Sequence, residues 1–362
     1  MAIFGSSNES YLGVDLSRDS IKIVELKNDN NKPRLVTYGY TEVKTDDLGG
    51  HFIENKNATS ATLKEVCQRS KTTTTTALAA LPIANVFTSV ISLHDLTKKD
   101  LTNDEKIKSL LTVEAKKILP LPIEQMLFDY SMVNNSDIDK KAETDRIEST
   151  KFLITATAND IVKAYADIFQ QAGLKLTNLD IEPFALVKSL IGNDKSLIML
   201  LDIGENMTSL SVIDDGIPIM NRTILVGSKA VSKQIADSLK ISFAEAEQYK
   251  IDLEVALSQQ NLPDLPQPVK TALIPIISEI KYLIKMYSEQ VSNQKSIDKV
   301  ILTGGGAVLA LLPEYLSKTL DLRVYLGDPW ARIIYPQELT GMLKQIGPRF
   351  SVAVGLAMRE II

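Results

Sequence analysis

Residues 198–213 read IMLLDIGENMTSLSVI, and residues 11–26 read YLGVDLSRDSIKIVEL. Each stretch is an apolar strand that ends in an aspartate, Asp202 or Asp15, followed by a turn of small and polar residues and a second strand. A turn rich in Asn, Asp or Gly then leads to a third strand in both cases. One such meander is common, but two copies with aspartate at the same strand end predict a duplicated fold with a pseudo-twofold relation between its halves.

A segment with mixed helix and strand signals separates the two copies. Residues Thr102–Glu105 form a capping-box pattern that predicts the start of a helix. The residues expected on its buried face are Ile107, Leu110, Leu111, Ala115 and Ile118. Strands are expected at 127–133 and 151–156, with an exposed polar loop at 134–149 between them, and Asn159 is expected to cap a second helix. The insert therefore reads strand–helix–strand–strand–helix, a small α+β module.

The part of the chain after the second copy is dominated by helix signals. Ser228 is expected to cap one helix, and the capping box Ser242–Glu245 is expected to open the next. A long apolar periodicity predicts a helix over about 269–290, and a closing helix is expected over about 348–362. The second half is thus predicted to carry more helix than the first.

Composition excludes several classes of protein. Of the 362 residues, 40 are Lys or Arg and 45 are Asp or Glu, which gives a net charge of −5 and argues against a protein whose main task is nucleic-acid binding. Cys67 cannot form an internal disulfide, and together with His51 and His94 it supplies too few ligands for a Cys/His zinc site. The N-terminus lacks a secretory pattern, and the apolar stretches are of strand length. We therefore expect a cytoplasmic protein.

The two strand-end aspartates are the first candidates for chemistry. A tight turn between strands points successive backbone N–H groups into one concavity, which suits a phosphate group. Asp15 and Asp202 end such strands and are well placed to hold the water shell of Mg²⁺, which needs few carboxylates. Either aspartate alone is more often a simple turn residue, whereas the pair is placed to face one nucleotide from both sides of a cleft.

Two further groups of residues point to the same ligand. Gly304, Gly305 and Gly306 follow a predicted strand and are expected to open a helix, where they let an anion lie against bare backbone at the helix N-terminus. The spacing is that of neither a P-loop nor a dinucleotide fingerprint. Glu247 and Lys250 lie three residues apart on one helix face. Such a pair is usually a solvated ion pair, but beside a nucleotide it is suited to bind the ribose hydroxyls and to lie against the base.

The order of these elements resembles the actin-like ATPase superfamily, which includes actin, DnaK-type chaperones, sugar kinases and the bacterial proteins FtsA and MreB. The resemblance implies an α/β fold of the actin-like, ribonuclease H-like duplicated type, with two lobes around a cleft that binds ATP and Mg²⁺. It implies as nucleotide ligands Asp15, Ser17, Arg18, Ser20, Lys22, Asp202, Gly204, Asn206, Thr208, Glu247, Lys250, Gly304, Gly305 and Gly306. Asp15 and Asp202 would hold the magnesium ion through water.

The resemblance also implies a division of the chain. The insert, at 84–175, resembles the distinctive small subdomain of FtsA proteins. The first core subdomain would comprise 1–83, 176–195 and 345–362, the second would comprise 196–228 and 296–344, and a helical nucleotide-contacting subdomain would span 229–295.

A closer resemblance is to the PilM family of type IV pilus assembly proteins. It is carried most specifically by Glu114–Pro122, which reads EAKKILPLP, and by Leu179–Ala185, which reads LDIEPFA. The resemblance implies an ATP-binding scaffold on the cytoplasmic side of the inner membrane, in a pilus or a related secretion machine. As partners it implies the short cytoplasmic N-terminal peptide of a PilN-like membrane protein, the pilus assembly complex and its motor ATPase; it also allows a homo-oligomer.

One departure from the family concerns the first phosphate loop. PilM proteins usually have Asp/Glu-Ile-Gly there, whereas this chain has Asp15-Leu-Ser-Arg-Asp-Ser20, and losing the glycine restricts how closely backbone approaches phosphate. Arg18 is suited to compensate as a cationic ligand, whereas Asp19 would repel phosphate if it pointed inward. We expect nucleotide binding through Lys22, the second loop and the glycines, with hydrolysis slow or absent and no catalytic residue identified.

Two other functions fit the same superfamily. An FtsA-like division protein would carry a C-terminal amphipathic membrane helix, whereas this sequence ends at Met358–Ile362 within the expected last helix, which favours the scaffold. A small-molecule kinase would need a catalytic base and a sugar-sized polar pocket, and the sequence identifies neither.

Overall fold

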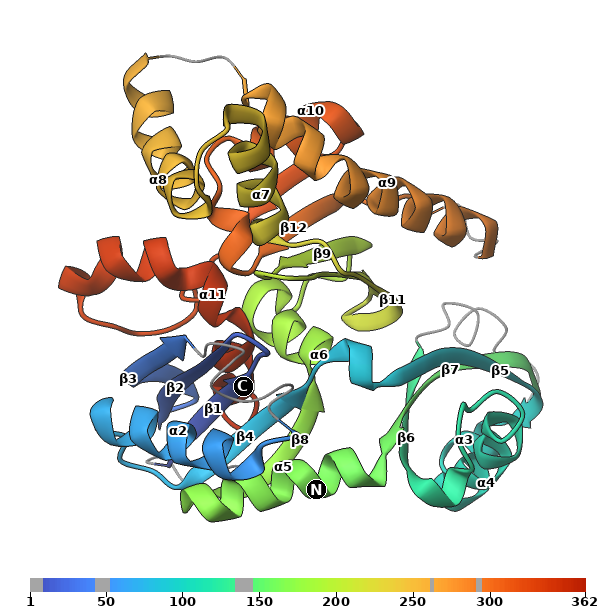
Figure 1. The fold of residues 1–362 in the computed structure, drawn as a ribbon. Coiled ribbons are helices and arrows are strands. Elements are labelled where there is room, and N and C mark those ends of the chain that lie inside the picture. Colours follow the sequence, from blue (N-terminus) through green and yellow to red (C-terminus); the bar gives the residue numbers. More distant parts are fainter. Residues whose placement is uncertain (1–8, 43–52, 134–145, 261–263, 291–294) are drawn as a thin grey trace.

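The computed structural model describes residues 9–42, 53–133, 146–260, 264–290 and 295–362. Two five-stranded sheets form the centres of two lobes, as Figure 1 shows. The first has the order β3-β2-β1-β4-β8, from β1 (Ser10–Leu16), β2 (Ser20–Asp29), β3 (Lys32–Glu42), β4 (Thr76–Leu81) and β8 (Lys175–Ile181). The second has the order β11-β10-β9-β12-β13, from β9 (Ile198–Ile203), β10 (Thr208–Asp214), β11 (Ile217–Ile224), β12 (Lys299–Thr303) and β13 (Arg323–Leu326).

The two sheets share one pairing pattern. In each, three consecutive strands pair antiparallel, and two later strands add in parallel on the other side of the first strand. The duplication predicted from the repeated strand–aspartate–turn pattern is therefore confirmed.

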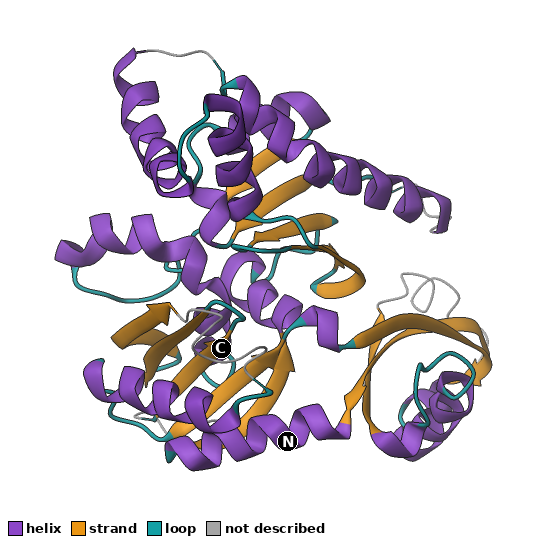
Figure 2. Ribbon diagram, in the orientation of Figure 1, coloured by secondary structure: helices purple, strands orange, loops and turns teal. Residues whose placement is uncertain are grey.

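Helices cover both faces of the first sheet (Figure 2). On one face α2 (Lys56–Arg69) packs against α5 (Asn159–Ala172), and α5 buries Tyr165 and Phe169 beside Leu12 and Val14 of β1. The other face carries α11 (Thr340–Met358). Between the sheets, α11 joins α6 (Glu182–Leu186) and the π-helical turn Val187–Ile191 in a core that both sheets share.

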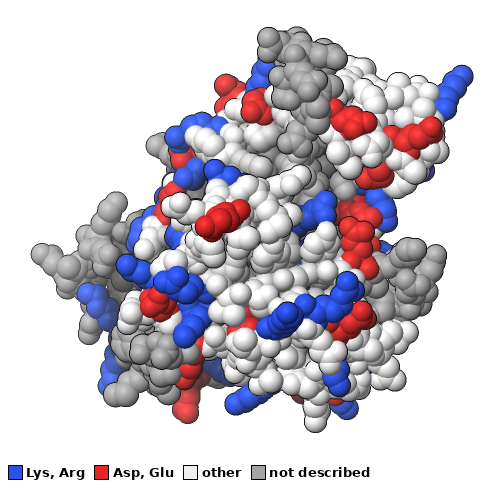
Figure 3. Space-filling model, turned by 90° about the vertical axis from the view of Figure 1, so that its left-hand side faces the viewer, with Lys and Arg blue, Asp and Glu red and all other residues white. Residues whose placement is uncertain are grey.

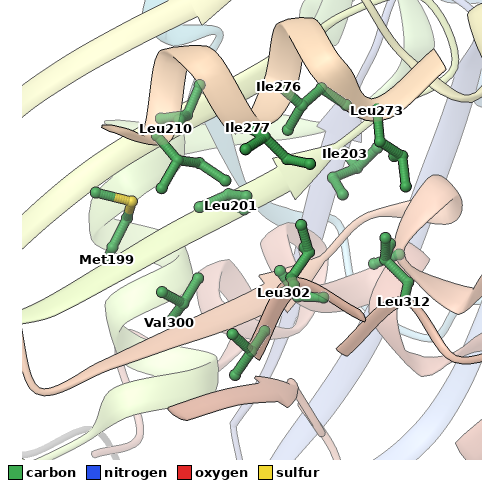
Figure 4. Close-up of a cluster of buried hydrophobic side chains, with 14 of the residues drawn as sticks. Met199, Leu201, Ile203, Leu210, Leu273, Ile276, Ile277, Val300, Leu302 and Leu312 are labelled. Carbon is green, nitrogen blue, oxygen red and sulfur yellow. The ribbon is translucent and has the colours of Figure 1, made fainter. Parts of the chain in front are cut away.

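The second lobe contains the largest buried apolar cluster of the described chain (Figure 4). Its helices are α7 (Ser228–Leu239), α8 (Phe243–Gln260), α9 (Gln267–Gln290) and α10 (Leu312–Leu320). Leu273, Ile276 and Ile277 of α9 lie over Leu201 and Leu210 of the sheet. The helical period of α9 and the alternation of β9 and β10 thus direct their apolar side chains into one core.

The insert forms a separate three-stranded antiparallel sheet, on the right in Figure 1. Its order is β5-β7-β6, from β5 (Phe87–Thr97), β6 (Met126–Val133) and β7 (Arg146–Ala158), with α3 (Lys98–Leu101) and α4 (Asp104–Ala115) on one face. The second predicted helix of the insert, α5, packs in the core of the first lobe instead. The amphipathic pattern of α5 shows that one face is buried but not which sheet buries it. Without α5, the order of elements in the insert is strand–helix–strand–strand.

Several predicted boundaries are corrected. Helix α4 is capped by Asn103, whose side chain accepts from the Lys106 N–H, and Thr102 closes the short α3 before it. Leu110 and Ile118 were expected to be buried but are 37% and 42% exposed. Helix α4 ends at Ala115, before Ile118, and within α4 the buried face is formed by Ile107, Leu111 and Ala115 without Leu110. Asn159 is the first residue of α5 rather than its cap.

Other elements begin earlier than predicted. Strand β7 already begins at Arg146, whereas positions 134–145 of the expected loop lie outside the described residues. Gly227, not Ser228, is the cap of α7, and α11 begins at Thr340 with Pro348 inside it. The capping box at Ser242 and Glu245 is confirmed by its two reciprocal hydrogen bonds.

On the face shown in Figure 3, acidic and basic side chains are interspersed with uncharged surface. Among the described helices, none has both the length and the apolar character needed to cross a membrane.

Candidate functional site

A cleft of about 920 Å³ lies between the two lobes. The predicted residues that line it are Asp15, Ser17, Arg18, Ser20, Lys22, Asp202, Gly204, Asn206, Glu247, Lys250, Gly304, Gly305 and Gly306. Thr208 does not line it: its side chain is buried, and its hydroxyl donates to the Val226 carbonyl at 2.7 Å. The structure therefore brings all but one of the predicted ligands to a single cleft.

Strand register explains this convergence. The β1–β2 and β9–β10 turns follow the two aspartates, because Asp15 pairs with Lys22 and Asp202 pairs with Ser209. Parallel strand β12 places Thr303 opposite Asp202, so the glycine run begins beside that carboxylate. Equivalent strand ends of the duplicated sheets thus supply both aspartates.

Asp15 is compensated within its own hairpin. Lys22 Nζ donates to Asp15 Oδ2 at 2.9 Å and to Ser17 Oγ at 2.9 Å, and the Ser17 hydroxyl donates to Asp15 Oδ1 at 3.0 Å. Asp15 is only 6% exposed. The charge-assisted contacts fix the carboxylate at the floor of the cleft, and they also engage the lysine predicted to contact phosphate.

Two more carboxyl groups face Asp15. Burial raises the pKa of Asp202 to about 6, with a further contribution from the charge of Asp15. Burial likewise raises the pKa of Glu182 to about 8, and the charges of Asp15 and Asp202 add to the rise. Like charges near one another in a shielded site disfavour ionisation, and a cation placed among them relieves the repulsion.

This donor set fits a hydrated magnesium ion. Within the described residues, no group of three or more His, Cys, Asp or Glu side chains is arranged to hold an ion directly. Mg²⁺ commonly keeps several waters and binds through one or two carboxylates together with substrate phosphates. The three acidic side chains therefore suit a cation that arrives with a phosphate ligand.

Glu182 is a site residue that the sequence reasoning missed. It is the first residue of α6, directly after β8, and its Oε2 accepts a hydrogen bond from the Ile83 N–H at 3.1 Å. The signal was present in Asp180-Ile-Glu-Pro-Phe184, where a Pro at the start of a helix marks a strand-to-helix junction and places an acidic residue directly after a strand. Lys344 and Arg349 of α11 also line the cleft and were not predicted.

The glycine run contacts the second aspartate directly. Gly304 has φ +86° and ψ 167°, and a Cβ there would lie 2.3 Å from Asp202 Oδ1 and 2.5 Å from the Ile203 carbonyl oxygen. A Cβ on Gly306 would meet Ile203 Cγ2 at 2.6 Å. The run continues as a 3-10 turn, Gly305–Val308, and α10 begins only at Leu312, so the glycines do not open an α-helix as expected.

Helix α8 provides the wall at the other end of the cleft. Lys250 Nζ lies 3.0 Å from Glu247 Oε1 and donates to the Ser228 carbonyl at 3.3 Å, while the Ser232 hydroxyl donates to Glu247. The half-exposed Phe243 lines the cleft from the same helix. This wall combines a fixed ion pair with an apolar surface, which suits a sugar hydroxyl and a flat base.

The comparisons with known proteins agree with this architecture. The family model described as type IV pilus assembly protein PilM matches residues 13–361. Cell division protein FtsA of Neisseria meningitidis serogroup B is 22% identical over 379 residues, covering 96% of this chain and 88% of that protein. FtsA of Bacillus subtilis is 22% identical over 375 residues, covering 93% and 83%.

Solved structures show the same fold. A chain of a PilM–PilN type IV pilus biogenesis complex superposes with a TM-score of 0.77 at 22% identity, covering 97% of this chain and 98% of that chain. MreB5 of Spiroplasma citri bound to ADP gives a TM-score of 0.51 at 12% identity, covering 96% and 94%. The predicted α/β actin-like ATPase fold is thereby confirmed.

Proposed function

Because this chain belongs to the PilM family of type IV pilus assembly proteins, we propose that it is an ATP-binding scaffold of the complex that assembles the pilus at the inner membrane. In this proposal it works on the cytoplasmic side and docks the N-terminal peptide of a PilN-like membrane protein. The observation that carries nucleotide binding is the convergence of both strand-end aspartates and the glycine run on one cleft. The similarity to a chain of a PilM–PilN complex supports the partner.

The cleft residues divide the work of binding. Asp15 and Asp202 would hold the water shell of Mg²⁺, which neutralises phosphate charge when it is bound. The backbone of the two turns and of Gly304–Gly306 would lie against the phosphates, and Glu247 and Lys250 would contact the ribose and base. Arg18 is exposed at the cleft and forms no ion pair with any described residue, so its guanidinium is available to a phosphate group.

Slow or absent hydrolysis remains part of the proposal. Rapid phosphoryl transfer depends on cations placed where charge develops. Here Lys22 is engaged by Asp15 and Ser17, and the Ser17 N–H is used by the Ser20 carbonyl at 2.9 Å. The first loop therefore offers few free donors, which supports a protein that reads nucleotide rather than one that consumes it rapidly.

A short path connects the cleft with the insert. The 3-10 turn Ile83–Asn85 lines the cleft, is bonded to Glu182 through Ile83, and leads directly into β5. From the other lobe, the Asn221 side chain reaches Thr88 Oγ1 on β5 at 3.4 Å. Movement of the lobes around a nucleotide would therefore act on the insert from two sides, and a bound partner could sense it.

The insert also offers apolar surface for a partner peptide. Leu127 and Met132 on β6 are 54% and 42% exposed, and Val113 on α4 is 56% exposed. We propose them as candidate contacts for the peptide, because a docking site needs exposed apolar side chains. They support docking beside the insert without identifying which of these residues the peptide contacts.

The test is a titration of the full chain with a synthetic N-terminal peptide of the PilN-like protein encoded nearby, with and without Mg-ATP. A scrambled peptide of the same composition serves as the control. The proposal predicts saturable binding of the native peptide only, with an affinity that changes when nucleotide is present. Nucleotide binding without any peptide binding would remove the pilus scaffold from consideration.

The FtsA matches sustain a second candidate, a division protein that assembles at the membrane. This candidate predicts ATP-dependent filaments that sediment with lipid vesicles in the absence of any partner. A soluble chain that neither polymerises nor sediments under those conditions would exclude it.

A further inference from the structure

A hydrogen bond between the lobes closes the phosphate end of the cleft. Asp19 lies in the β1–β2 turn, and Asn206 lies in the β9–β10 turn of the other lobe. Asn206 Nδ2 donates to Asp19 Oδ2 at 2.7 Å, and both residues line the cleft. The turns expected to receive phosphate are therefore joined to each other in this structure.

The surroundings of Asp19 leave its charge largely uncompensated. Seven acidic and five basic side chains line the cleft. Asp15 is paired with Lys22, and Glu247 is paired with Lys250. Asp19 has a neutral amide as its partner and no ion pair among the residues that the structure describes.

A cation does lie near Asp19, but another group holds it. Lys229 Nζ is 2.7 Å from Glu205 Oε1. This hydrogen bond raises the pKa of Lys229, and the charge of Asp19 adds a smaller contribution. An anion entering between the turns would consequently meet the Asp19 carboxylate and find the Asn206 amide already in use.

We propose that Asp19 sets the affinity of the cleft for nucleotide, because its carboxylate holds an unpaired negative charge against the Asn206 amide that a phosphate group would use. The inference rests on the proposed nucleotide binding and adds a residue that weakens it. A phosphate ligand must break the bond between Asp19 and Asn206, and it must bring enough positive charge, as Mg²⁺, to offset the carboxylate. The same bond holds the two turns together.

The test compares Mg-ATP titrations of the full-length wild type, Asp19→Asn and Glu42→Gln by calorimetry. Asp19→Asn keeps the shape and can still accept the Asn206 hydrogen bond, but it removes the charge. Glu42 is an exposed residue that lines the cleft, and Glu42→Gln changes the net charge equally without touching the bond between the lobes. For unit charges about 4 Å apart in a medium as polar as bulk water, removing the repulsion is expected to lower the Kd of Asp19→Asn by at least about fivefold. Glu42→Gln should change the Kd by less than about twofold, since exposed charges are well screened.

Two further measurements separate charge from general disturbance. Raising NaCl from 0.1 to 0.5 M should shrink the advantage of Asp19→Asn, because salt screens the repulsion that the variant removes. Amide hydrogen exchange of the ligand-free Asn206→Ala variant should be faster in residues 16–20 and 204–207 than in the wild type. Bound Mg-ATP should cancel that difference.

The outcomes distinguish the inference from the proposed function. Tighter binding by Asp19→Asn alone supports the inference. Equal or weaker binding by Asp19→Asn, or an equal gain in Glu42→Gln, overturns it while nucleotide binding stands. No saturable binding by the wild type or either variant removes the proposed nucleotide function, and the inference falls with it.

Discussion

Replacing Gly304 with alanine should separate the geometry of the cleft from the stability of the fold. At φ +86° and ψ 167° the backbone is in a region almost restricted to glycine, where another residue costs about 1–3 kcal/mol. The added Cβ would also meet Asp202 Oδ1 at 2.3 Å, so the carboxylate must move. A domain stable by about 5–15 kcal/mol survives such a loss, but the proposed magnesium ligand is displaced.

The assay pairs thermal unfolding with Mg-ATP calorimetry. We expect the midpoint of Gly304→Ala to fall by roughly 3–10 °C. Its affinity for Mg-ATP should fall at least about tenfold, a change of about 1.4 kcal/mol. Gly341→Ala is the matched control, because a Cβ at Gly341 meets nothing within 4 Å and Gly341 lies outside the cleft. If Gly304→Ala kept the midpoint and the affinity of the wild type, the reasoning about this loop would be refuted.

Four other predictions concern the cleft and the core. The pKa of Glu182 is raised from 4.5 to about 8 in the folded state, so the folded state binds more protons than the unfolded state between these pH values. The ligand-free protein should therefore lose stability as the pH rises from about 4.5 to about 8, which thermal unfolding measures. Because Glu182 holds a proton at pH 7 and a bound cation favours its ionised form, Mg-ATP binding at pH 7 should release protons, seen as different binding heats in Tris and phosphate buffers. Glu182→Gln should reduce the release, and equal heats in both buffers would contradict this prediction. Removing Mg²⁺ with EDTA should weaken ATP binding at least about tenfold, because acidic side chains outnumber basic ones in the cleft lining; equal affinity in EDTA would contradict the proposed role of the aspartates. Gly355→Ala should leave little soluble protein, because its Cβ would lie 1.8 Å from the Ala185 carbonyl oxygen, where α11 crosses α6. A normal yield with an unchanged thermal unfolding midpoint would show that these helices can separate.

The sequence was informative where a local pattern fixes the structure. The alternation of apolar residues and the turn after each aspartate determined two hairpins, so the duplicated sheets were predictable. Asp15 and Asp202 end equivalent strands of the two repeats, so the sequence alone predicted that they face one cleft. Gly304 was recognisable because three glycines follow directly on a predicted strand.

Contacts between distant parts of the chain were not predictable in this way. The sequence of α5 shows that one face of the helix is apolar, but only the fold determines that this face packs in the first lobe rather than on the insert. The bond from Asn206 to Asp19 joins the two lobes, and neither turn carries a local signal for it. Thr208 was assigned to the cleft by its loop, yet the alternation along β10 directs its hydroxyl into the fold.

The most direct test of the central claim is a calorimetric titration of the full chain with Mg-ATP, beside the Asp202→Ala variant. The account predicts saturable binding to one site by the wild type below about 1 mM, which corresponds to about −4 kcal/mol, and at least a tenfold loss in the variant. Absence of saturable heat in the wild type, or an unchanged affinity in Asp202→Ala, would contradict the claim that the paired strand-end aspartates form a nucleotide site.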